Sequence, residues 1–275
     1  QRAAASQKRL NEFLHTKPSL IVSPEPLPCN GINQLKFDKV NFTYPHTGIY
    51  AVRDFSLDVK RGEKIAILGK TGCGKSTIAQ LCLRMFDPTT GSVTINEIDL
   101  RDMELESLRS QISYVPQDVF LFSDTIANNI AIGEDSIDKQ KLRKAVEIAN
   151  IQDFIEDLPL SYNTKIGNEG IGVSGGQKQR LFIARAVYKS PDYIFFDEAT
   201  NALDANNESI IMQNLEEFFK GKTVVVVAHR LSTVKNADNI VVIDKGIITE
   251  QGTHAELTSN KGEYYQLVKN QLELN

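Results

Sequence analysis

A short run near position 70 combines glycines, a lysine and hydroxyl side chains at fixed spacing. The sequence GKTGCGKS, Gly69 to Ser76, follows the apolar run KIAIL at 64–68. Glycines let backbone N–H groups turn inward around phosphate oxygens, and a helix beginning at Lys75 would direct its positive dipole end at the same anion. Lys75 adds a charge for the β- and γ-phosphates, and Ser76 a hydroxyl for Mg²⁺. The pattern predicts a phosphate-binding loop; the alternative is a glycine-rich turn without a ligand. The predicted nucleotide contacts are Gly69, Lys70, Thr71, Gly72, Cys73, Gly74, Lys75, Ser76 and Thr77.

Two adjacent acids follow a second apolar run far along the chain. Asp197 and Glu198 come directly after Tyr193–Phe196, which has the pattern of a buried strand. Open α/β sheets bind ligands at the carboxyl ends of their strands, so both acids are expected at the nucleotide. We predict that Asp197 joins Ser76 as a Mg²⁺ ligand and that Glu198 polarises a water molecule as general base. The alternative is a pair of solvated acids at a strand end.

The segments that carry these residues alternate between strand and helix patterns. Continuous apolar runs predict buried parallel strands, and apolar residues at helical spacing predict helices between them. The stretch 35–59 instead has the period-2 pattern of antiparallel strands. The predicted fold class is α/β, with a mostly parallel sheet, an N-terminal antiparallel β subdomain and a helical subdomain at about 120–175. Further predicted strands are 92–96, 112–115, 223–228, 240–243 and 247–249; predicted helices are 75–86, 137–158, 175–188, 208–219 and 262–272.

The first 34 residues differ from the rest. Leu10, Phe13 and Leu14 have helical spacing and predict one short amphipathic helix. Four prolines between positions 18 and 28 then favour an extended linker, because proline fits neither a helix interior nor a central strand. A disordered tail is the alternative. We therefore divide the chain into 1–34 and a catalytic domain at 35–275.

Composition excludes several classes of function. The 275 residues carry 31 basic and 35 acidic side chains and no tryptophan, so a nucleic-acid-binding surface is disfavoured. Three irregularly spaced cysteines exclude a disulfide scaffold and favour a reducing compartment. Cys73 is expected to have a lowered thiol pKa beside Lys75, and Cys29 to be an accessible linker thiol. No apolar run reaches the roughly 18 residues of a membrane span, no signal peptide is recognised, and the start at Gln1 suggests a fragment.

The sequence VSGGQ at 173–177 indicates the family. This sequence resembles the signature of the ABC ATPases. It lies at the start of the helix predicted at 175–188 and precedes Asp197 and Glu198 along the chain. Other positions match the same family in order, and the match covers about 35–272. The resemblance implies that Ser174, Gly175, Gly176 and Gln177 bind nucleotide. It also implies that Tyr44 stacks on adenine, that Gln117 contacts metal and water, and that His229 contacts the γ-phosphate. Asp204 resembles the D-loop aspartate and is also expected to contact nucleotide. The alternatives are a core tyrosine, a plain loop amide and a structural histidine.

Further details resemble the exporter type, in which membrane and ATPase domains share one chain. They are the Q-loop region 118–126, Glu169 before the signature, and the amphipathic start, which resembles the end of a last transmembrane helix. Val119–Phe122 is expected to be a partly exposed apolar patch that receives a loop of the membrane domain, or else a buried strand. Val173 and Asn201 depart from the usual Leu and Ser, but neither change removes a phosphate ligand.

The resemblance implies a motor that binds and hydrolyses ATP with Mg²⁺ at the cytoplasmic face of the cell (inner) membrane. Two such domains would close head to tail around two ATP, each signature covering the partner's γ-phosphate, while the isolated domain stays soluble. One alternative is a soluble ABC ATPase acting on nucleic acid or ribosomes; the other is a regulatory ATP-binding module. The transported substrate (lipid, drug or peptide), pairing with an identical or a different half, and any extra N-terminal domain stay open.

Overall fold

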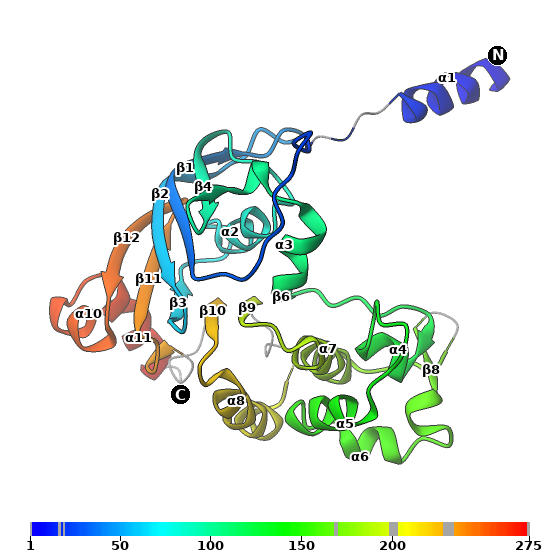
Figure 1. The fold of residues 1–275 in the computed structure, drawn as a ribbon. Helices are drawn as coiled ribbons and strands as arrows, with labels where there is room; N and C mark the ends of the chain where they lie inside the picture. The colour runs from blue at the N-terminus through cyan, green and yellow to red at the C-terminus, as the bar shows by residue number, and fades with distance from the viewer. Residues whose placement is uncertain are drawn as a thin grey trace.

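The computed structural model describes residues 2–15, 18, 20–167, 170–197, 203–227 and 234–273. Two sheets and a group of helices make up the body, and the N-terminal helix α1 (Arg2–Leu14) extends away from it (Figure 1). Within the described residues, no helix combines the length and apolar character needed to cross a bilayer. The predicted α/β fold with a mostly parallel sheet is confirmed.

A six-stranded sheet forms the centre of the molecule. Its strand order is β12-β11-β3-β10-β9-β6, and all neighbours are parallel except the edge pair β11–β12. Alternate residues of the central strands enter two different cores: Ile65 and Ile67 pack on one face, Ala66 and Leu68 on the other. Burial on both faces explains why these strands read as continuous apolar runs. The strands are β3 (Lys64–Leu68), β6 (Ile112–Val115), β9 (Tyr193–Asp197), β10 (Thr223–Val227), β11 (Asn239–Asp244) and β12 (Ile247–Gly252).

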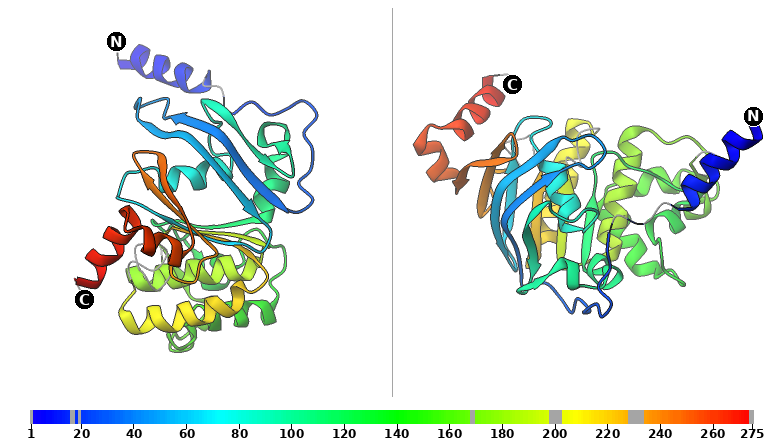
Figure 2. Two further views of the ribbon diagram at one scale, coloured as in Figure 1. Left: turned by 90° about the vertical axis from the view of Figure 1, so that its left-hand side faces the viewer. Right: turned by 90° about the horizontal axis from the view of Figure 1, so that it is seen from above.

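A four-stranded antiparallel sheet, in the order β2-β1-β4-β5, covers one side of this centre. Helix α2 (Lys75–Cys82) lies between the two sheets (Figure 2), and its Ile78 and Leu81 belong to the same core as Phe37 and Phe55 of the smaller sheet. The helix that begins at the phosphate loop is therefore held from two sides. The smaller sheet contains β1 (Gln34–Thr43), β2 (Tyr50–Lys60), β4 (Thr90–Ile95) and β5 (Ile98–Asp99), followed by η1 (Leu100–Asp102) and α3 (Leu105–Gln111).

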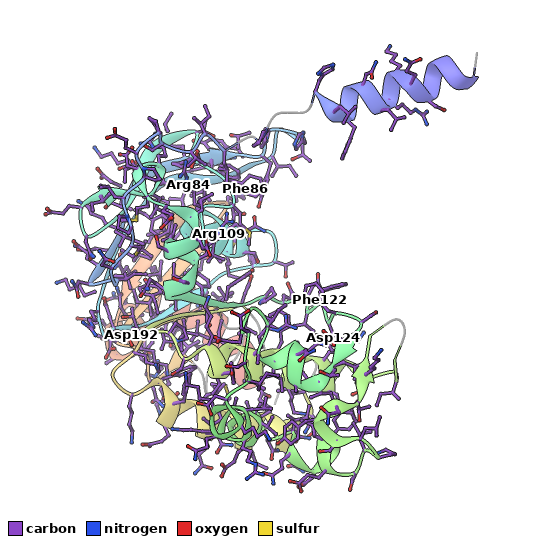
Figure 3. All side chains as sticks on the ribbon, turned by 45° about the vertical axis from the view of Figure 1, so that its right-hand side comes forward. Arg84, Phe86, Arg109, Phe122, Asp124 and Asp192 are labelled. Carbon is purple, nitrogen blue, oxygen red and sulfur yellow. The ribbon has the colours of Figure 1, made fainter. Side chains whose placement is uncertain are left out.

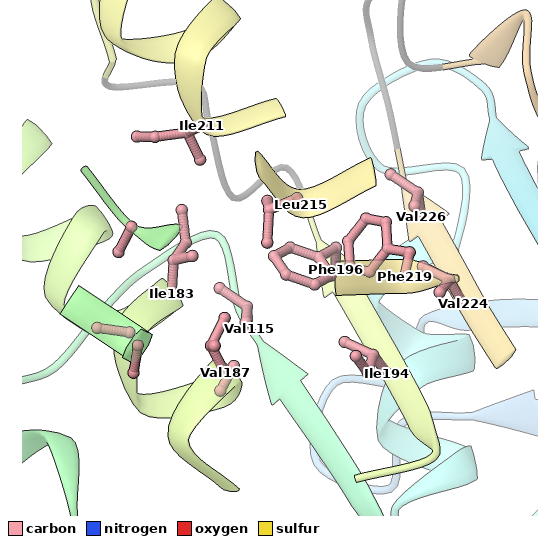
Figure 4. Packing of buried hydrophobic residues seen from close by; sticks show 14 of the residues in the cluster. Val115, Ile183, Val187, Ile194, Phe196, Ile211, Leu215, Phe219, Val224 and Val226 are labelled. Carbon is pink, nitrogen blue, oxygen red and sulfur yellow. The ribbon is translucent and has the colours of Figure 1, made fainter. Parts of the chain in front are cut away.

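Helices cover the opposite face of the central sheet. In Figure 4, Ile183 and Val187 of α7 lie near Val115 of β6, while Leu215 and Phe219 of α8 pack toward the strands. Helices α4 and α5 pack on α7 and form a lobe beside the sheet (Figure 1). The elements here are β7 (Asp124–Thr125), α4 (Ile126–Ile130), α5 (Lys139–Ile148), α6 (Gln152–Glu156), η2 (Ser161–Asn163), β8 (Lys165–Ile166), α7 (Gly175–Lys189) and α8 (Ala205–Phe219); α10 (His254–Asn260) and α11 (Glu263–Glu273) end the described chain.

Some predicted boundaries were wrong for local reasons. The helix expected at 75–86 ends at Cys82, because Arg84 takes a left-handed φ of 47° and closes the last turn. The stretch 137–158, predicted to be helical, forms two helices, α5 and α6, separated at Asn150 with φ 49°. Asparagine tolerates this conformation better than most residues, and its side chain bonds Asn207.

The proline-containing segment is extended, as expected, but from residue 20 onward it packs on the body. The buried Arg84 donates from Nη2 to the Ile21 carbonyl at 2.7 Å, and the backbone of Leu27 pairs with both Asp102 and Glu104. Cys29 is 4% exposed, and its backbone N–H donates to Ser107 Oγ at 3.0 Å. A disordered tail is therefore wrong for this part.

Candidate nucleotide site

The predicted site residues meet at one edge of the central sheet. Strand β10 is parallel to both β3 and β9, and β6 is parallel to β9. The carboxyl ends of these strands therefore point the same way. The loop that starts at Gly69 leaves β3 there, Asp197 is the last residue of β9, and Gln117 follows β6 by two positions. The strands of one sheet are about 4.8 Å apart, which places β9 about 10 Å from β3 with β10 between them.

The phosphate loop depends on glycines whose backbone has no room for a side chain. Gly74 has φ 110°, and a Cβ there would lie 2.4 Å from the Ala51 carbonyl oxygen. Gly69 is equally confined, because its Cβ would lie 2.2 Å from the Ile243 carbonyl oxygen. The loop is also tied to the neighbouring hairpin, since Gly246 N donates to the Cys73 carbonyl at 2.9 Å. The loop backbone is thus fixed against β2 and β11 before any ligand binds.

The lysine of the loop is held inside it. Lys75 is 5% exposed, and its Nζ donates to the carbonyl oxygens of Gly69 at 2.8 Å and Lys70 at 3.1 Å. Lys70, Thr71 and Gly72 are exposed above it, and Ser76 is partly exposed. The ammonium therefore lies under the loop's open side, at the start of α2, where helix-end N–H groups favour an anion.

Asp197 is buried at the end of β9 and has a partner that the sequence analysis missed. It is 2% exposed, and Tyr114 of β6 donates its hydroxyl to Oδ2 at 3.3 Å. The burial of Tyr114 and the nearby carboxylate raise the pKa of the phenol strongly, so it remains protonated and a donor. No pattern along the chain signalled this partner, because it depends on the parallel pairing of β6 with β9, which sets Tyr114 opposite Phe195, two residues before the aspartate.

Tyr44 follows the last residue of β1 and is partly exposed. Its hydroxyl is 2.9 Å from both Thr77 Oγ1 and Gln80 Oε1 on α2. The ring makes edge contacts with Phe42 and Phe86, at centroid distances of 4.9 and 5.4 Å. These contacts fix the ring beside the helix that starts at the phosphate loop, and adenine stacking stays a prediction.

The remaining residues of the predicted catalytic set divide into two groups. Gln117 is exposed in the loop after β6, at the same sheet edge as Asp197. Glu198 and His229, predicted as general base and γ-phosphate contact, lie outside the described residues, as do Glu169 and Asn201. Strands β9 and β10, which lead toward Glu198 and His229, are described and end where predicted to within one residue.

The predicted signature begins a helix at the surface, as expected. Ser174 is the N-cap of α7: Gln177 N donates to Ser174 Oγ at 3.2 Å, and Ser174 N donates to Gln177 Oε1 at 2.8 Å. Ser174 and Gly175 are exposed, and Gly176 is partly exposed. The reciprocal bonds satisfy two terminal N–H groups and leave the other N–H groups of the first turn for a ligand or water.

Comparison with known proteins decides the family. Residues 52–201 match the family model described as ABC transporter. The chain belongs to the ABC transporter family. It is 42% identical over 274 residues to ATP-binding cassette sub-family B member 5 of Mus musculus, and 46% identical over 239 residues to an ATP-dependent lipid A-core flippase of Photobacterium profundum. Those alignments cover 97% and 86% of this chain, but 22% and 40% of the relatives, so the chain spans less than half of either protein.

A solved structure agrees with this assignment. A bacterial Atm1-family ABC exporter with ATP bound has a TM-score of 0.91 and 36% identity, covering 98% of this chain and 48% of that one. The predicted resemblance to exporter-type ABC proteins is confirmed, and nucleotide binding follows from the family. The individual roles of the site residues stay predictions.

A polar network connects the helix of the predicted signature with the predicted D-loop. Asp204, predicted in the D-loop, is the N-cap of α8 and accepts bonds from the Asn207 backbone N–H at 3.0 Å and side-chain Nδ2 at 2.7 Å, which lower its pKa. Asn207 Oδ1 accepts in turn from Asn150 Nδ2 at 2.9 Å, and Arg180 of α7 donates to the Asn150 carbonyl at 2.6 Å. The network joins α7, which begins at the predicted signature, to the start of α8, and the sequence patterns gave no sign of it.

Both predictions about thiols were wrong. Burial outweighs the Lys75 charge and raises the pKa of the Cys73 thiol instead of lowering it. Burial also raises the pKa of Cys29, which is not the accessible linker thiol that the prolines suggested. Cys73 is covered because the loop wraps over it: a Cβ on Gly69 would lie only 2.6 Å from its Sγ.

The expected apolar patch is present in the loop after β6. Phe120 is 64% exposed and Phe122 47%, with ring centroids 5.1 Å apart, whereas Leu121 between them is buried. Phe122 lies at the surface of the helical lobe in Figure 3, apart from Arg109 of α3. A groove of about 740 Å³ nearby is lined by α3 and α7, with Tyr114, Ile132 and Arg185 among its walls.

Proposed function

We propose that this chain is the motor domain of an ABC exporter, which binds and hydrolyses Mg-ATP to drive transport across a membrane. One observation carries the proposal: a buried lysine lies under a glycine loop at the start of α2, at the same sheet edge as a buried aspartate. A nucleotide triphosphate fits this arrangement, because amide N–H groups, the helix end and one full charge converge on a single anion.

The side chains present suit a magnesium ion. Ser76, Gln117 and Asp197 offer a hydroxyl, an amide carbonyl and a carboxylate, the oxygen ligands that Mg²⁺ prefers alongside water. Bound there, the ion would neutralise charge that develops on the β- and γ-phosphates during transfer. Lys75 binds the phosphates, Gln117 and His229 orient the attacking water and the γ-phosphate, and Glu198 accepts the water's proton.

A second copy would complete the site. The signature N–H groups of α7 lie on the helical lobe, whereas the phosphate loop lies between the two sheets. A head-to-tail pair would place each signature over the γ-phosphate held by its partner and form an isologous interface. ATP would hold the two domains together, and hydrolysis would release them.

The membrane-domain partner is proposed from two apolar surfaces. Helix α1 exposes Leu10, Phe13 and Leu14, and we assign it to the end of a transmembrane helix that enters the domain. The Phe120–Phe122 patch would receive a loop of the same membrane domain. We place the domain at the cytoplasmic face of the membrane and keep the division into 1–34 and 35–275; the exported substrate is selected elsewhere.

The test is ATP hydrolysis by the purified chain, measured with and without Mg²⁺ and with and without DNA or RNA. We expect Mg²⁺-dependent phosphate release that nucleic acid does not change, from a protein that is monomeric without nucleotide. Lys75→Ala should lose nucleotide binding and activity together, whereas Lys220→Ala, which removes an exposed lysine paired with Glu217, should keep both. Hydrolysis that required RNA or DNA would replace the proposal with the nucleic-acid alternative.

A further inference from the structure

Tyr114 is not among the predicted site residues, but its side chain bonds one of them directly. Its hydroxyl donates to Asp197 Oδ2 at 3.3 Å, and the aspartate is buried. A buried carboxylate can turn about its last torsion unless a donor holds one oxygen. The bond from Tyr114 occupies one side of Oδ2 and so restricts the orientation in which the carboxylate can meet a cation.

The tyrosine itself is well fixed. Its ring meets Phe195 edge-on at a centroid distance of 6.2 Å, and its backbone is paired with that residue across parallel strands β6 and β9. One side of the residue borders the groove between α3 and α7. The donor is therefore supported by the sheet and does not depend on a mobile loop.

Its position on the chain adds a second constraint. β6 ends at Val115, so Tyr114 is three residues before Gln117, the predicted metal contact of the following loop. One short strand thus carries the donor to one predicted metal ligand and leads directly into the loop that holds another. A shift of this strand would move Gln117 and change the orientation of Asp197 together.

We propose that Tyr114 is a positioning residue for the metal site: its hydroxyl holds Asp197 in the orientation that accepts Mg²⁺ with bound nucleotide. The inference rests on the proposed function. Hydrogen-bond partners of metal ligands affect metal affinity by about 10- to 100-fold when removed, and the 3.3 Å bond favours the lower figure. The ring and its packing have no part in this effect beyond placing the hydroxyl.

The experiment compares two matched substitutions in the full chain. Tyr114→Phe removes the donor and keeps the ring; Tyr193→Phe removes a phenol hydroxyl four residues before Asp197 that has no hydrogen-bond partner within the described part of the chain. Binding of a fluorescent ATP analogue is titrated with Mg²⁺, and binding of Mn²⁺ in the presence of nucleotide is followed by electron paramagnetic resonance. Thermal unfolding shows that each variant is folded.

We expect Tyr114→Phe to need about ten-fold more Mg²⁺ or Mn²⁺ for half-saturation, with nucleotide binding in EDTA unchanged. Tyr193→Phe should match the wild type in both titrations. Unchanged metal titrations in a folded Tyr114→Phe variant would overturn the inference alone. If the wild-type chain itself bound nucleotide with no response to either metal, the proposed function would fail first.

Discussion

Replacing Gly74 with alanine tests whether the phosphate loop works because its backbone is locked against β2. The new Cβ would lie 2.4 Å from the Ala51 carbonyl oxygen, about 0.6 Å inside the 3.0 Å that real Cβ atoms keep. Ala51 belongs to β2, which is paired along β1, so the loop has to give way rather than the strand. The N–H groups at the start of α2 would then move off the phosphate position.

Gly62→Ala is the matched control at the other end of β3. Gly62 also has a positive φ, 79°, but a Cβ there meets nothing within 4 Å. Both changes carry the left-handed backbone cost of about 1–2 kcal/mol for a residue with a Cβ. The contact at Gly74 adds the cost of overpacking, about 1–3 kcal/mol. The free energy of unfolding should therefore fall by about 1–2 kcal/mol in the control and about 2–5 kcal/mol in Gly74→Ala.

Nucleotide affinity separates the two variants further. We expect Gly74→Ala to bind ATP at least about ten-fold more weakly, since 1.4 kcal/mol of lost phosphate contact has that effect. Gly62→Ala should bind as the wild type does. Urea unfolding followed by circular dichroism gives the stability, and a fluorescent ATP analogue gives the affinity. The reasoning is refuted if the two alanine variants have equal stability and equal affinity.

Three further predictions follow from the same site. Glu198→Gln should still bind ATP but hydrolyse it at least about 100-fold more slowly, since loss of a general base costs about 10²–10⁴ in rate. A dimer of this variant should accumulate in size-exclusion chromatography with Mg-ATP. Near-normal turnover would assign the general-base role to His229 or Gln117 instead. Ser174→Ala should lose about 1 kcal/mol of stability, because it removes the N-cap of α7, while the monomer still binds ATP. The double variant Ser174→Ala/Glu198→Gln should not form the ATP-dependent dimer. A dimer as stable as that of Glu198→Gln alone would contradict the signature's role. At neutral pH, Cys73 should react with a thiol reagent more slowly than free cysteine, and its rate should increase as the pH rises toward its raised pKa. Bound ATP should slow the reaction further. Equal rates with and without saturating ATP would contradict a contact between ATP and the loop that contains Cys73.

Residue positions were predicted best from the sequence where the residue type has one specific structural role, such as capping a helix or ending a buried strand. Lys75, Asp197 and Ser174 each stand at the end of an element with a clear pattern, and the structure places all three at such ends. Their immediate surroundings depend on contacts between distant segments, and patterns along the chain do not carry these. The bond between Tyr114 and Asp197 joins residues 83 apart, and the bond between Asn150 and Asn207 joins residues 57 apart.

The predictions that failed most clearly concern residues whose burial could not be seen in the sequence. Four nearby prolines correctly predicted an extended segment, but extension does not decide whether a segment is solvated. Cys29 and Ile32 become part of the core beneath the antiparallel sheet, so the thiol is covered although its neighbours lie in no helix or long strand. For Cys73, charge was visible in the sequence and desolvation was not, and desolvation is the larger effect on its pKa.

The bond between Arg84 and the Ile21 carbonyl connects the N-terminal segment mechanically to the phosphate loop through α2. Arg84 lies two residues beyond the end of α2, a helix about 12 Å long whose first residue is Lys75. Tension along the segment that leads from α1 would reach this arginine before the bonds made by Leu27 and Cys29 and before β1. Helix α2 therefore has Lys75 of the phosphate loop near one end and the attachment of the N-terminal segment near the other, so a force on that segment would reach the loop along one short helix.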